Sequence, residues 1–366
     1  MVEQNNKENY LVSTFFVFFL IHSSQTGIGL LSFQNTIIEN AGHDSWISVI
    51  ITGLSLHIIL WMILKMVSNP TKDLLKIHQI SFGEKIGNFL SVIVIGYFLL
   101  LALTVFRTYI EVIQVWVFPM IKTWELSLGL ACLIIYIITG GFRTLTGLSF
   151  LGVVLPSILL LTLYFPLQYA NFRNLMPVFN HSILEIAQSS KASSLIFIGF
   201  ESLLIYFPFI KHPSKSAKWA HGALAFTTFI YLLVTLITFV YFSQGQLKHT
   251  LWPTLVMTKI VEMPFIMRFE FIFIFTWLLV ILPTVCIPIW CCTRILKKIT
   301  KIKPRKSLYT IMLFILLCSI FIDDRLKVDA LGKFTSEVGF YFIYSYIPLL
   351  FIIYSLRKSK FKSSEY

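Results

Sequence analysis

The chain has 366 residues, of which 57% are hydrophobic and only 13% are charged. A water-soluble domain has about a quarter of its residues charged, so this composition excludes a soluble fold and indicates a membrane protein. The net charge of +13 does not indicate nucleic-acid binding, because Lys and Arg are distributed among loops rather than gathered on a soluble face.

Long stretches without an ionised residue predict about ten membrane-spanning helices, because a helix needs roughly 20 apolar residues to cross the hydrocarbon core. Nine of these stretches contain no charge, and a tenth carries Glu201 near its middle. The expected fold class is therefore all-α, with residues 1–366 forming a single transmembrane domain. The spans are expected at residues 11–38, 46–66, 87–118, 125–140, 148–169, 192–210, 219–243, 270–296, 307–322 and 337–356.

The loops between these spans are short. The longest joins spans 7 and 8 over residues 243–268, and residues 70–85 are expected to hold a short amphipathic helix. Lys and Arg residues are distributed unequally between the two sides of the membrane. If the amino terminus is inside, the cytoplasmic segments carry 20 of these residues and the opposite loops carry nine. The positive-inside rule then predicts that both termini are cytoplasmic. The first apolar run is too long for a signal-peptide core, so it is expected to remain as span 1.

Two spans contain residues that a plain lipid-facing helix would avoid. Span 1 includes Gln25-Thr-Gly-Ile-Gly29, and its glycines are poor helix formers that leave the backbone accessible. Close helix packing through small residues explains these glycines equally well. Span 6 places Glu201 near the bilayer centre, where an ionised carboxylate costs at least a few kcal/mol unless it faces a cavity or a partner. For Glu201 the functional interpretation is favoured.

These two segments occupy corresponding positions, because each opens a block of five spans. Five is an odd number, so the second block enters the membrane from the opposite side, as in transporters built from inverted repeats. The repeats are expected at approximately residues 11–170 and 192–356. Spans 1 and 6 would then be broken at the midplane, with a ligand cavity between them.

The residues expected to line this cavity come from four spans. Spans 1 and 6 offer freed backbone groups, span 3 a tyrosine hydroxyl, and span 8 threonine hydroxyls near a proline, although ordinary packing also explains the tyrosine and the threonines. The predicted substrate-binding residues are Thr26, Gly27, Ile28, Gly29, Tyr97, Gly199, Phe200, Glu201, Thr276 and Thr284. Arg107 and Glu111 lie on one face of span 3 and are expected to form either a structural ion pair or a gate at the outer vestibule.

Motifs spread along the chain carry a resemblance to a known family. Span 6 resembles the equivalent segment of the amino acid, polyamine and organocation transporter superfamily. Nearly the whole chain is similar to the spore germination permease family, the B-type membrane subunits of nutrient germinant receptors in endospore-forming bacteria. The motifs are Gly27-x-Gly29, Arg107 and Glu111, Asn174-Leu-Met-Pro-Val178, Gly199-Phe-Glu201, Pro208-Phe-Ile-Lys211-x-Pro213, Trp252-Pro-Thr-Leu255, Lys259, Arg268-x-Glu270 and Trp277.

The resemblance implies a ten-span LeuT-like fold that works with an A-type and a C-type subunit in the inner membrane of the dormant spore. It further implies that the chain binds a small nutrient, such as an amino acid, between spans 1 and 6 and triggers germination. A stand-alone amino acid symporter or exchanger of the same fold is the alternative, and a channel without a small-molecule site is a third. The sequence leaves the nutrient, any coupling ion and the stoichiometry of the complex open.

The sequence contains no combination of nucleophile, base and orienting residue, no metal-ligand spacing and no phosphate-binding loop. An enzyme, a cofactor and a metal site are therefore not expected. The partners expected from the residues and the resemblance are a small nutrient, the companion receptor subunits and the lipid bilayer.

Overall fold

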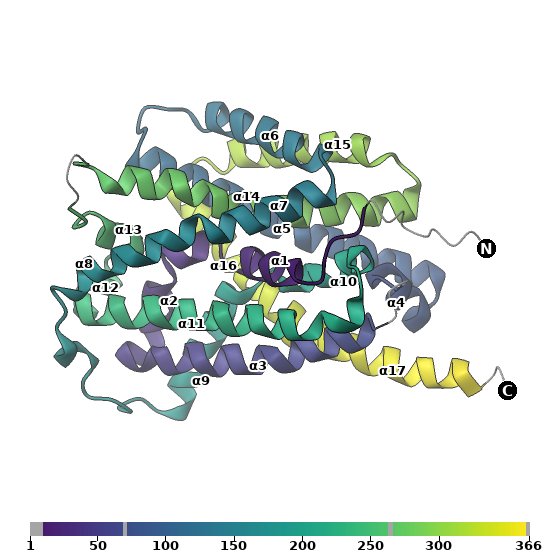
Figure 1. The fold of residues 1–366 in the computed structure, drawn as a ribbon, viewed down its shortest axis with the longest axis horizontal. Coiled ribbons are helices and arrows are strands. Elements are labelled where there is room, and N and C mark those ends of the chain that lie inside the picture. The colour runs from purple at the N-terminus through teal and green to yellow at the C-terminus, as the bar shows by residue number, and fades with distance from the viewer. Residues whose placement is uncertain (1–9, 69–71, 263–265, 364–366) are drawn as a thin grey trace.

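The computed structural model describes residues 10–68, 72–262 and 266–363. Over these residues the chain is a bundle of helices that run along the long axis of the molecule (Figure 1). The predicted all-α fold class is therefore confirmed. The extreme termini, predicted to be cytoplasmic, lie outside the described residues at 1–9 and 364–366.

Regular α-helices account for most of the described chain. In order they are α1 (Phe16–Gln25), α2 (Phe33–Ala41), α3 (Ser45–Met66), α4 (Leu74–Phe82), α5 (Glu84–Trp116), α6 (Thr123–Thr139), α7 (Phe142–Val154), α8 (Tyr164–Leu167), α9 (Ile183–Ser193), α10 (Leu203–Tyr206), α11 (Ala217–Tyr241), α12 (Gln244–Lys248), α13 (Pro253–Thr258), α14 (Phe269–Thr300), α15 (Pro304–Phe321), α16 (Arg325–Tyr341) and α17 (Ile347–Ser363).

Short 3-10 helices join or extend several of these elements, and one π-helix links α16 to α17. The 3-10 helices cover Ile28–Leu31, Gly42–Asp44, Pro156–Leu163, Phe172–Leu175, Ser194–Phe197, Phe200–Ser202, Phe207–Phe209 and Pro213–Lys215, and the π-helix covers Phe342–Tyr346.

Ten spans follow from these elements. Within the described residues, seven helical segments are long and apolar enough to cross a membrane, and three shorter apolar segments accompany them. Two of the short segments, Phe16–Gln25 and Phe200–Phe209, are parts of broken spans, and the third, Thr123–Thr139, is an intact span of 17 residues. The seven long segments are Phe33–Met66, Glu84–Trp116, Phe142–Leu167, Pro213–Tyr241, Phe269–Thr300, Pro304–Phe321 and Arg325–Arg357. The prediction of ten spans with breaks in spans 1 and 6 is confirmed.

The tenth span begins much earlier than the predicted residues 337–356. Its helix starts at Arg325, where the side chain of Asp324 accepts a hydrogen bond from the backbone N–H of Lys327 and caps the first turn. Arg325 also pairs with Asp329 one turn later, at 2.9 Å. Capping and pairing allow the helix to continue through these charged residues. The predicted span begins later because it is drawn only over a stretch without charged residues.

Span 6 also begins before the predicted residues 192–210. Helix α9 starts at Ile183, and Ser182 and Glu185 form a reciprocal capping box at 2.7–3.3 Å. Such a box satisfies N–H groups that the first helical turn leaves without partners. The predicted amphipathic helix within residues 70–85 is present as α4, capped by Asp73.

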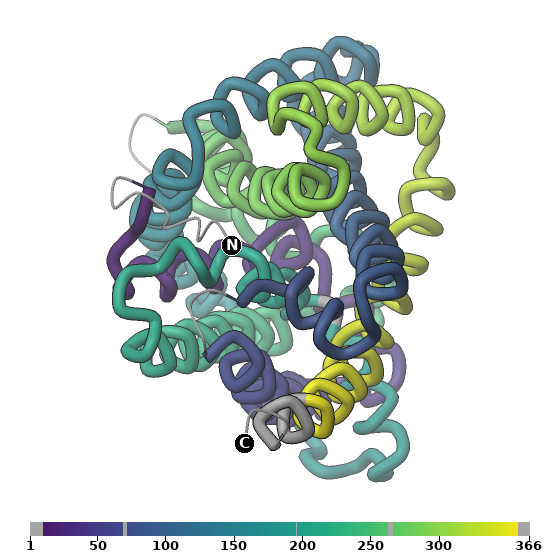
Figure 2. Tube along the Cα trace, turned by 90° about the vertical axis from the view of Figure 1, so that its right-hand side faces the viewer, coloured from purple at the N-terminus to yellow at the C-terminus, as the bar shows by residue number. Residues whose placement is uncertain are grey.

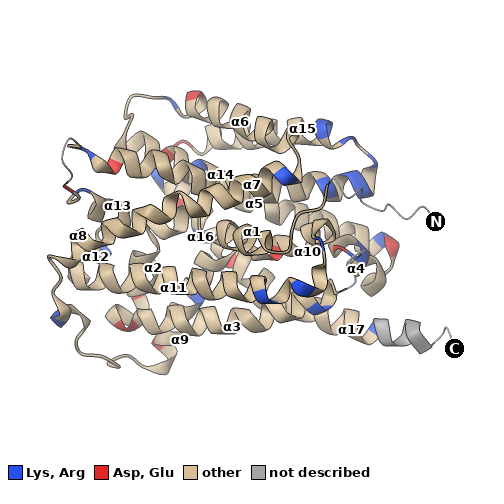
Figure 3. Ribbon diagram, in the orientation of Figure 1, with Lys and Arg blue, Asp and Glu red and all other residues tan. Residues whose placement is uncertain are grey.

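The helices form an inner group and outer walls. Figure 2 looks along the bundle and shows α6 and α15 side by side on its outside, while α14 lies further in, packed against α5, α7 and α1. The start of the described chain, α4 and the end of α17 lie at one end of the bundle, at the right of Figure 1. Lys and Arg gather at this same end (Figure 3), which carries the run between α14 and α15.

The contact between α7 and α14 depends on a glycine. A Cβ atom added at Gly152 would lie 2.3 Å from the carbonyl oxygen of Leu279 on α14, which is far inside van der Waals contact. A Cβ at Gly147, also on α7, would have nothing within 4 Å. The two helix backbones therefore approach closely at Gly152, where there is no room for a side chain.

We expect Gly152→Ala to destabilise the protein by about 1–3 kcal/mol, because the methyl group forces α7 and α14 apart. Gly147→Ala is the matched control on the same helix. Thermal melting of the two purified variants in one detergent measures the difference. Equal melting temperatures would contradict the packing of α7 on α14 described here.

Candidate functional site

Span 1 is broken between α1 and the 3-10 helix Ile28–Leu31. Thr26 has an extended backbone, with φ −88° and ψ 101°, and Gly27 follows at φ −135° and ψ −141°. The helical hydrogen-bond ladder therefore stops at Gln25. In a bilayer, backbone groups freed in this way need partners from neighbouring spans.

Side chains of spans 7 and 8 supply these partners. The hydroxyl of Tyr231 on α11 donates to the carbonyl of Gln25 at 3.1 Å. Thr284 Oγ1 on α14 lies 2.9 Å from the carbonyl oxygen of Ser23 and 3.3 Å from that of Thr26. The break is therefore fixed from two sides.

Span 6 is broken at Gly199, between the 3-10 helices Ser194–Phe197 and Phe200–Ser202. Gly199 has φ +122°, a conformation that glycine adopts readily and other residues do not. A Cβ at Gly199 would also lie 2.2 Å from the carbonyl oxygen of Ser24 in span 1. Both the backbone angle and the space therefore require glycine at this position.

The two breaks contact each other directly. Gly199 packs against the backbone of Ser24, and the Gln25 side-chain amide donates to the carbonyl of Phe197 at 3.0 Å. Gln25 Oε1 is buried and, among the described residues, has no hydrogen-bond partner. The contact thus contains an amide oxygen that can still accept a hydrogen bond.

Glu201 lies beside this contact and is 0% exposed. Its Oε2 accepts from the backbone N–H of Gly199 at 2.8 Å, and its Oε1 accepts from the hydroxyl of Tyr97 at 2.6 Å. The Tyr97 ring stacks on Phe342 of span 10, with centroids 4.1 Å apart. The carboxyl group therefore connects the span 6 break to spans 3 and 10.

Most of the predicted binding residues lie around these breaks. Gly27 lies against Thr284, whose Cγ2 would be 3.1 Å from an added Cβ, and Tyr97 contacts Glu201. Ile28 and Gly29 belong to the 3-10 helix after the first break, and Phe200 is fully buried after the second. Thr276 is half-buried and lies earlier on α14 than Thr284, whose hydroxyl reaches span 1.

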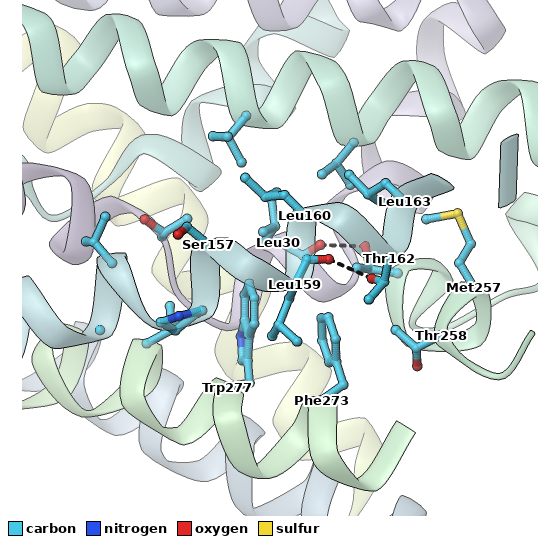
Figure 4. A pocket seen from close by; sticks show the side chains of 18 of the residues that line it. Leu30, Ser157, Leu159, Leu160, Thr162, Leu163, Met257, Thr258, Phe273 and Trp277 are labelled. Atoms are coloured by element: carbon cyan, nitrogen blue, oxygen red, sulfur yellow. Dashed lines mark hydrogen bonds between the residues drawn. The ribbon is translucent and has the colours of Figure 1, made fainter. Parts of the chain in front are cut away.

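An open pocket lies next to the breaks rather than between spans 1 and 6 (Figure 4). It lies between α1, span 5, α11, α13 and α14, and Thr26 is the predicted binding residue in its wall. No group of His, Cys, Asp or Glu side chains in the described part of the chain is placed to hold a metal ion.

Arg107 and Glu111 do not form a hydrogen-bonded ion pair with each other. Glu111 Oε1 instead pairs with Arg325 of span 10 at 2.7 Å. Arg107 donates to the backbone carbonyls of Ile322 and Asp323 in the turn before α16. The mutual pair that their spacing predicts is replaced because span 10 starts early and brings Arg325 to Glu111, so both residues tie span 3 to span 10.

Sequence reasoning missed three residues that hold the site together: Gln25, Tyr231 and Phe342. Gln25 adjoins the recognised glycines, and a polar amide in an apolar span was a usable signal. Tyr231 and Phe342 carried no such signal, because buried aromatic residues are common in membrane helices and their partners are distant in sequence.

We expect Gly199→Ala to reduce folded protein strongly, because the methyl group meets the Ser24 carbonyl and the residue must keep a positive φ. Gly29→Ala is the matched control, since its Cβ would meet Ile196 Cγ2 at 3.6 Å, an ordinary contact. Membrane protein level and gel-filtration profile measure the outcome. A Gly199→Ala protein as abundant and monodisperse as Gly29→Ala would contradict the geometry of the span 6 break.

Comparisons with known proteins agree with this architecture. The chain is 41% identical to spore germination protein GerQB of Bacillus cereus over 348 residues, covering 95% of this chain and 97% of that protein. It is 23% identical to spore germination protein A2 of Bacillus subtilis (strain 168), covering 95% and 96%. The crystal structure of MhsT in complex with L-phenylalanine matches with a TM-score of 0.60 at 11% identity, covering 95% of this chain and 99% of that one.

The match to MhsT shows a LeuT-like fold, as the broken spans 1 and 6 indicate. A family model described as "Spore germination protein" matches residues 11–328, most of the chain. Together with the identity to GerQB, this shows that the chain belongs to the spore germination protein family, the spore permeases.

Proposed function

We propose that this chain is the B-type membrane subunit of a nutrient germinant receptor. It binds a small nutrient, of the amino acid class, between the breaks of spans 1 and 6 and passes the signal to companion subunits. The observation that carries the proposal is Glu201, a fully buried carboxyl group beside the contact between the two breaks. A carboxyl group at this depth is costly to bury, so an ionisable residue inside a span is by default a candidate functional residue.

The chemistry around the breaks suits an amino acid. Helix ends bind charged groups: carbonyls at the end of a half-helix attract an ammonium, and N–H groups at the start of one attract a carboxylate. Buried Gln25 Oε1 and the carboxylate oxygens of Glu201 are further acceptors for an ammonium group. MhsT, which has the same fold, holds L-phenylalanine.

Binding would compete with bonds inside the protein. An ammonium that takes Glu201 as its partner weakens the bond from the Tyr97 hydroxyl, and Tyr97 stacks on Phe342 at the start of the π-helix. At the other end of that π-helix, Tyr346 contacts His78 of α4. The nutrient signal then travels from the central carboxyl group through span 10 to α4, at the basic end of the bundle.

We propose that the basic end of the bundle is cytoplasmic and that the protein lies in the inner membrane of the spore, with both termini inside. The A-type and C-type subunits receive the signal. The gathering of Lys and Arg at this end supports the orientation.

Cysteine labelling tests the orientation. In a chain with Cys132 replaced by Ser, we expect Lys301→Cys to be protected from an impermeant maleimide in intact cells, because the residue follows α14 at the basic end. Gly245→Cys, exposed on α12, is the control and should label freely. The reverse pattern would overturn the proposed topology.

Replacement of Glu201 by Gln keeps its size and removes its charge. We expect Glu201→Gln to shift the nutrient dose response of germination rightward by roughly tenfold to hundredfold, because a charged hydrogen bond to the nutrient is lost. Glu39→Gln, at an exposed position on α2, is the control. Quantitative germination assays with immunoblots measure the effect. An unchanged dose response, maximal germination and protein level would show that Glu201 has no role in nutrient binding.

The fold of MhsT favours one alternative, a stand-alone amino acid symporter or exchanger. Uptake of radiolabelled amino acids into proteoliposomes containing the purified chain alone separates the two functions. The receptor proposal expects no concentrative uptake, together with co-purification of companion subunits from spore membranes. Sustained uptake by the chain alone would favour the transporter.

A further inference from the structure

The outward face of span 10 carries charged residues. Lys333 and Glu337 of α16 are both exposed. Thr335, between them in the sequence, is buried, and its hydroxyl lies 2.7 Å from that of Thr104 on α5. Successive residues of an α-helix are rotated by about 100°, so residues two positions apart point to nearly opposite sides. Lys333 and Glu337 therefore point away from the bundle, and Figure 2 shows this part of span 10, in yellow-green, at its right-hand edge.

Both residues lie at membrane depth. Phe342 follows α16 at the level of the span breaks, because it stacks on Tyr97, the partner of Glu201. With a rise of about 1.5 Å per residue, Glu337 lies about 8 Å and Lys333 about 14 Å from Phe342 along the helix. The hydrocarbon core extends about 15 Å to each side of its centre. Both charges are therefore exposed within the hydrocarbon region, in the half of the bundle away from its basic end.

Lipid is an unsuitable neighbour for this face. Neither side chain forms an ion pair or a hydrogen bond with a residue in the described part of the chain. Lys333 can extend its ammonium group toward the headgroups, but Glu337 lies one turn deeper and has a shorter side chain. Ionisable residues inside a membrane ordinarily face a partner or a water-filled cavity. Because these two point outward from the bundle, they indicate a protein partner.

The outward faces of other spans show the pattern that lipid contact favours. The exposed residues of α15 include Leu313 and Leu317, and those of α3 include Leu54 and Ile58. Span 10 itself returns to this pattern in its second half, where Leu349 is exposed. The charged residues are therefore confined to the outer half of span 10.

A third charge lies beside these two. Lys191, near the end of α9 in span 6, is exposed, and its ammonium group lies 5.3 Å from the ring centre of Phe340 and 5.8 Å from that of Tyr341. Lys191, Lys333 and Glu337 together form the charged lateral surface. With two lysines and one glutamate, this surface has an excess of positive charge. A partner that neutralises it must supply a carboxyl group at the same depth.

A second copy of this chain is a poor occupant of the charged lateral surface. Two copies insert into the membrane in the same orientation, and a two-fold axis places each residue near its own equivalent. Lysine would then face lysine and glutamate would face glutamate. Repulsion between like charges is strong where the dielectric constant is low.

We propose that the charged lateral surface binds a membrane-spanning helix of a companion protein, and that this helix carries an Asp or Glu side chain opposite Lys333 and Lys191. The proposal rests on the receptor function proposed above, in which companion subunits receive the signal. The helix would pack against α16 directly before the π-helix Phe342–Tyr346. The companion therefore contacts the span that is linked to Glu201 through Tyr97.

Defined peptides test the chemistry of the partner. The full-length chain, with Cys132 replaced by Ser and with Leu326→Cys carrying a fluorescent donor, is reconstituted in phosphatidylcholine vesicles with an acceptor-labelled transmembrane peptide. Three alternating Leu-Ala peptides differ only in one residue about 14 Å from the peptide centre, which is Glu, Leu or Lys. We expect saturable energy transfer to the Glu peptide and roughly tenfold weaker binding of the other two.

Charge reversal provides the matched pair of variants. Lys333→Glu should make the chain prefer the Lys peptide to the Glu peptide, a reversal that misfolding cannot produce. Lys248→Glu, at an exposed position on α12, is the control and should keep the preference for the Glu peptide. Equal transfer to all three peptides, or a preference for the Glu peptide that survives Lys333→Glu, would overturn the proposal.

Photo-cross-linking in spore membranes tests the identity of the occupant. A photoreactive maleimide is attached to Phe334→Cys, next to Lys333 and 57% exposed in the native protein, or to the control Leu313→Cys, 59% exposed on α15. With different epitope tags on this chain and its companion subunits, we expect cross-links from position 334 to a companion and none from position 313. Cross-links to a second copy, or none from position 334 while the companions still co-purify, would overturn the proposal. Failure of the companions to co-purify would instead contradict the receptor function itself.

Discussion

The architecture depends on the contact between the two broken spans. A membrane interior offers no water to freed backbone groups, so each break must be satisfied by neighbouring protein. Gly199 meets the Ser24 carbonyl, and Gln25 donates to Phe197 across the same contact. Tyr231 of span 7 donates to the Gln25 carbonyl, and the hydroxyl of Thr284 on span 8 lies within hydrogen-bond distance of the Ser23 and Thr26 carbonyls. The breaks therefore position four spans around one point near the middle of the bundle.

The same contact explains how a small ligand could act on a large protein. The bonds that satisfy the breaks are individually modest, and an amino acid offers an ammonium and a carboxylate that can replace them. A ligand shifts a conformational equilibrium only by its difference in affinity for the two states. In the proposed receptor this difference arises at Glu201, whose partner Tyr97 stacks directly on span 10. Span 10 is in turn linked to span 3 by Arg325 and Glu111.

Sequence alone predicted the features that follow from local chemistry. The ten spans follow from the cost of charge in lipid, and the breaks follow from glycines and a carboxylate at unusual depth. It failed where distant residues decide the outcome. The early start of span 10 depends on capping and pairing around Arg325, and Glu111 takes that residue rather than Arg107 as its partner. The anchoring role of Tyr231 depends on a contact between spans that no local pattern records.

Hydrogen–deuterium exchange of the full-length protein in nanodiscs tests the central claim most directly. Peptides covering residues 22–32 and 195–205 are followed with and without a saturating amino acid that triggers germination. If the nutrient binds between the breaks, exchange should slow in both segments together, because the ligand bridges them. Unchanged exchange in both segments, or slowing confined to other parts of the chain, would contradict a nutrient site between spans 1 and 6.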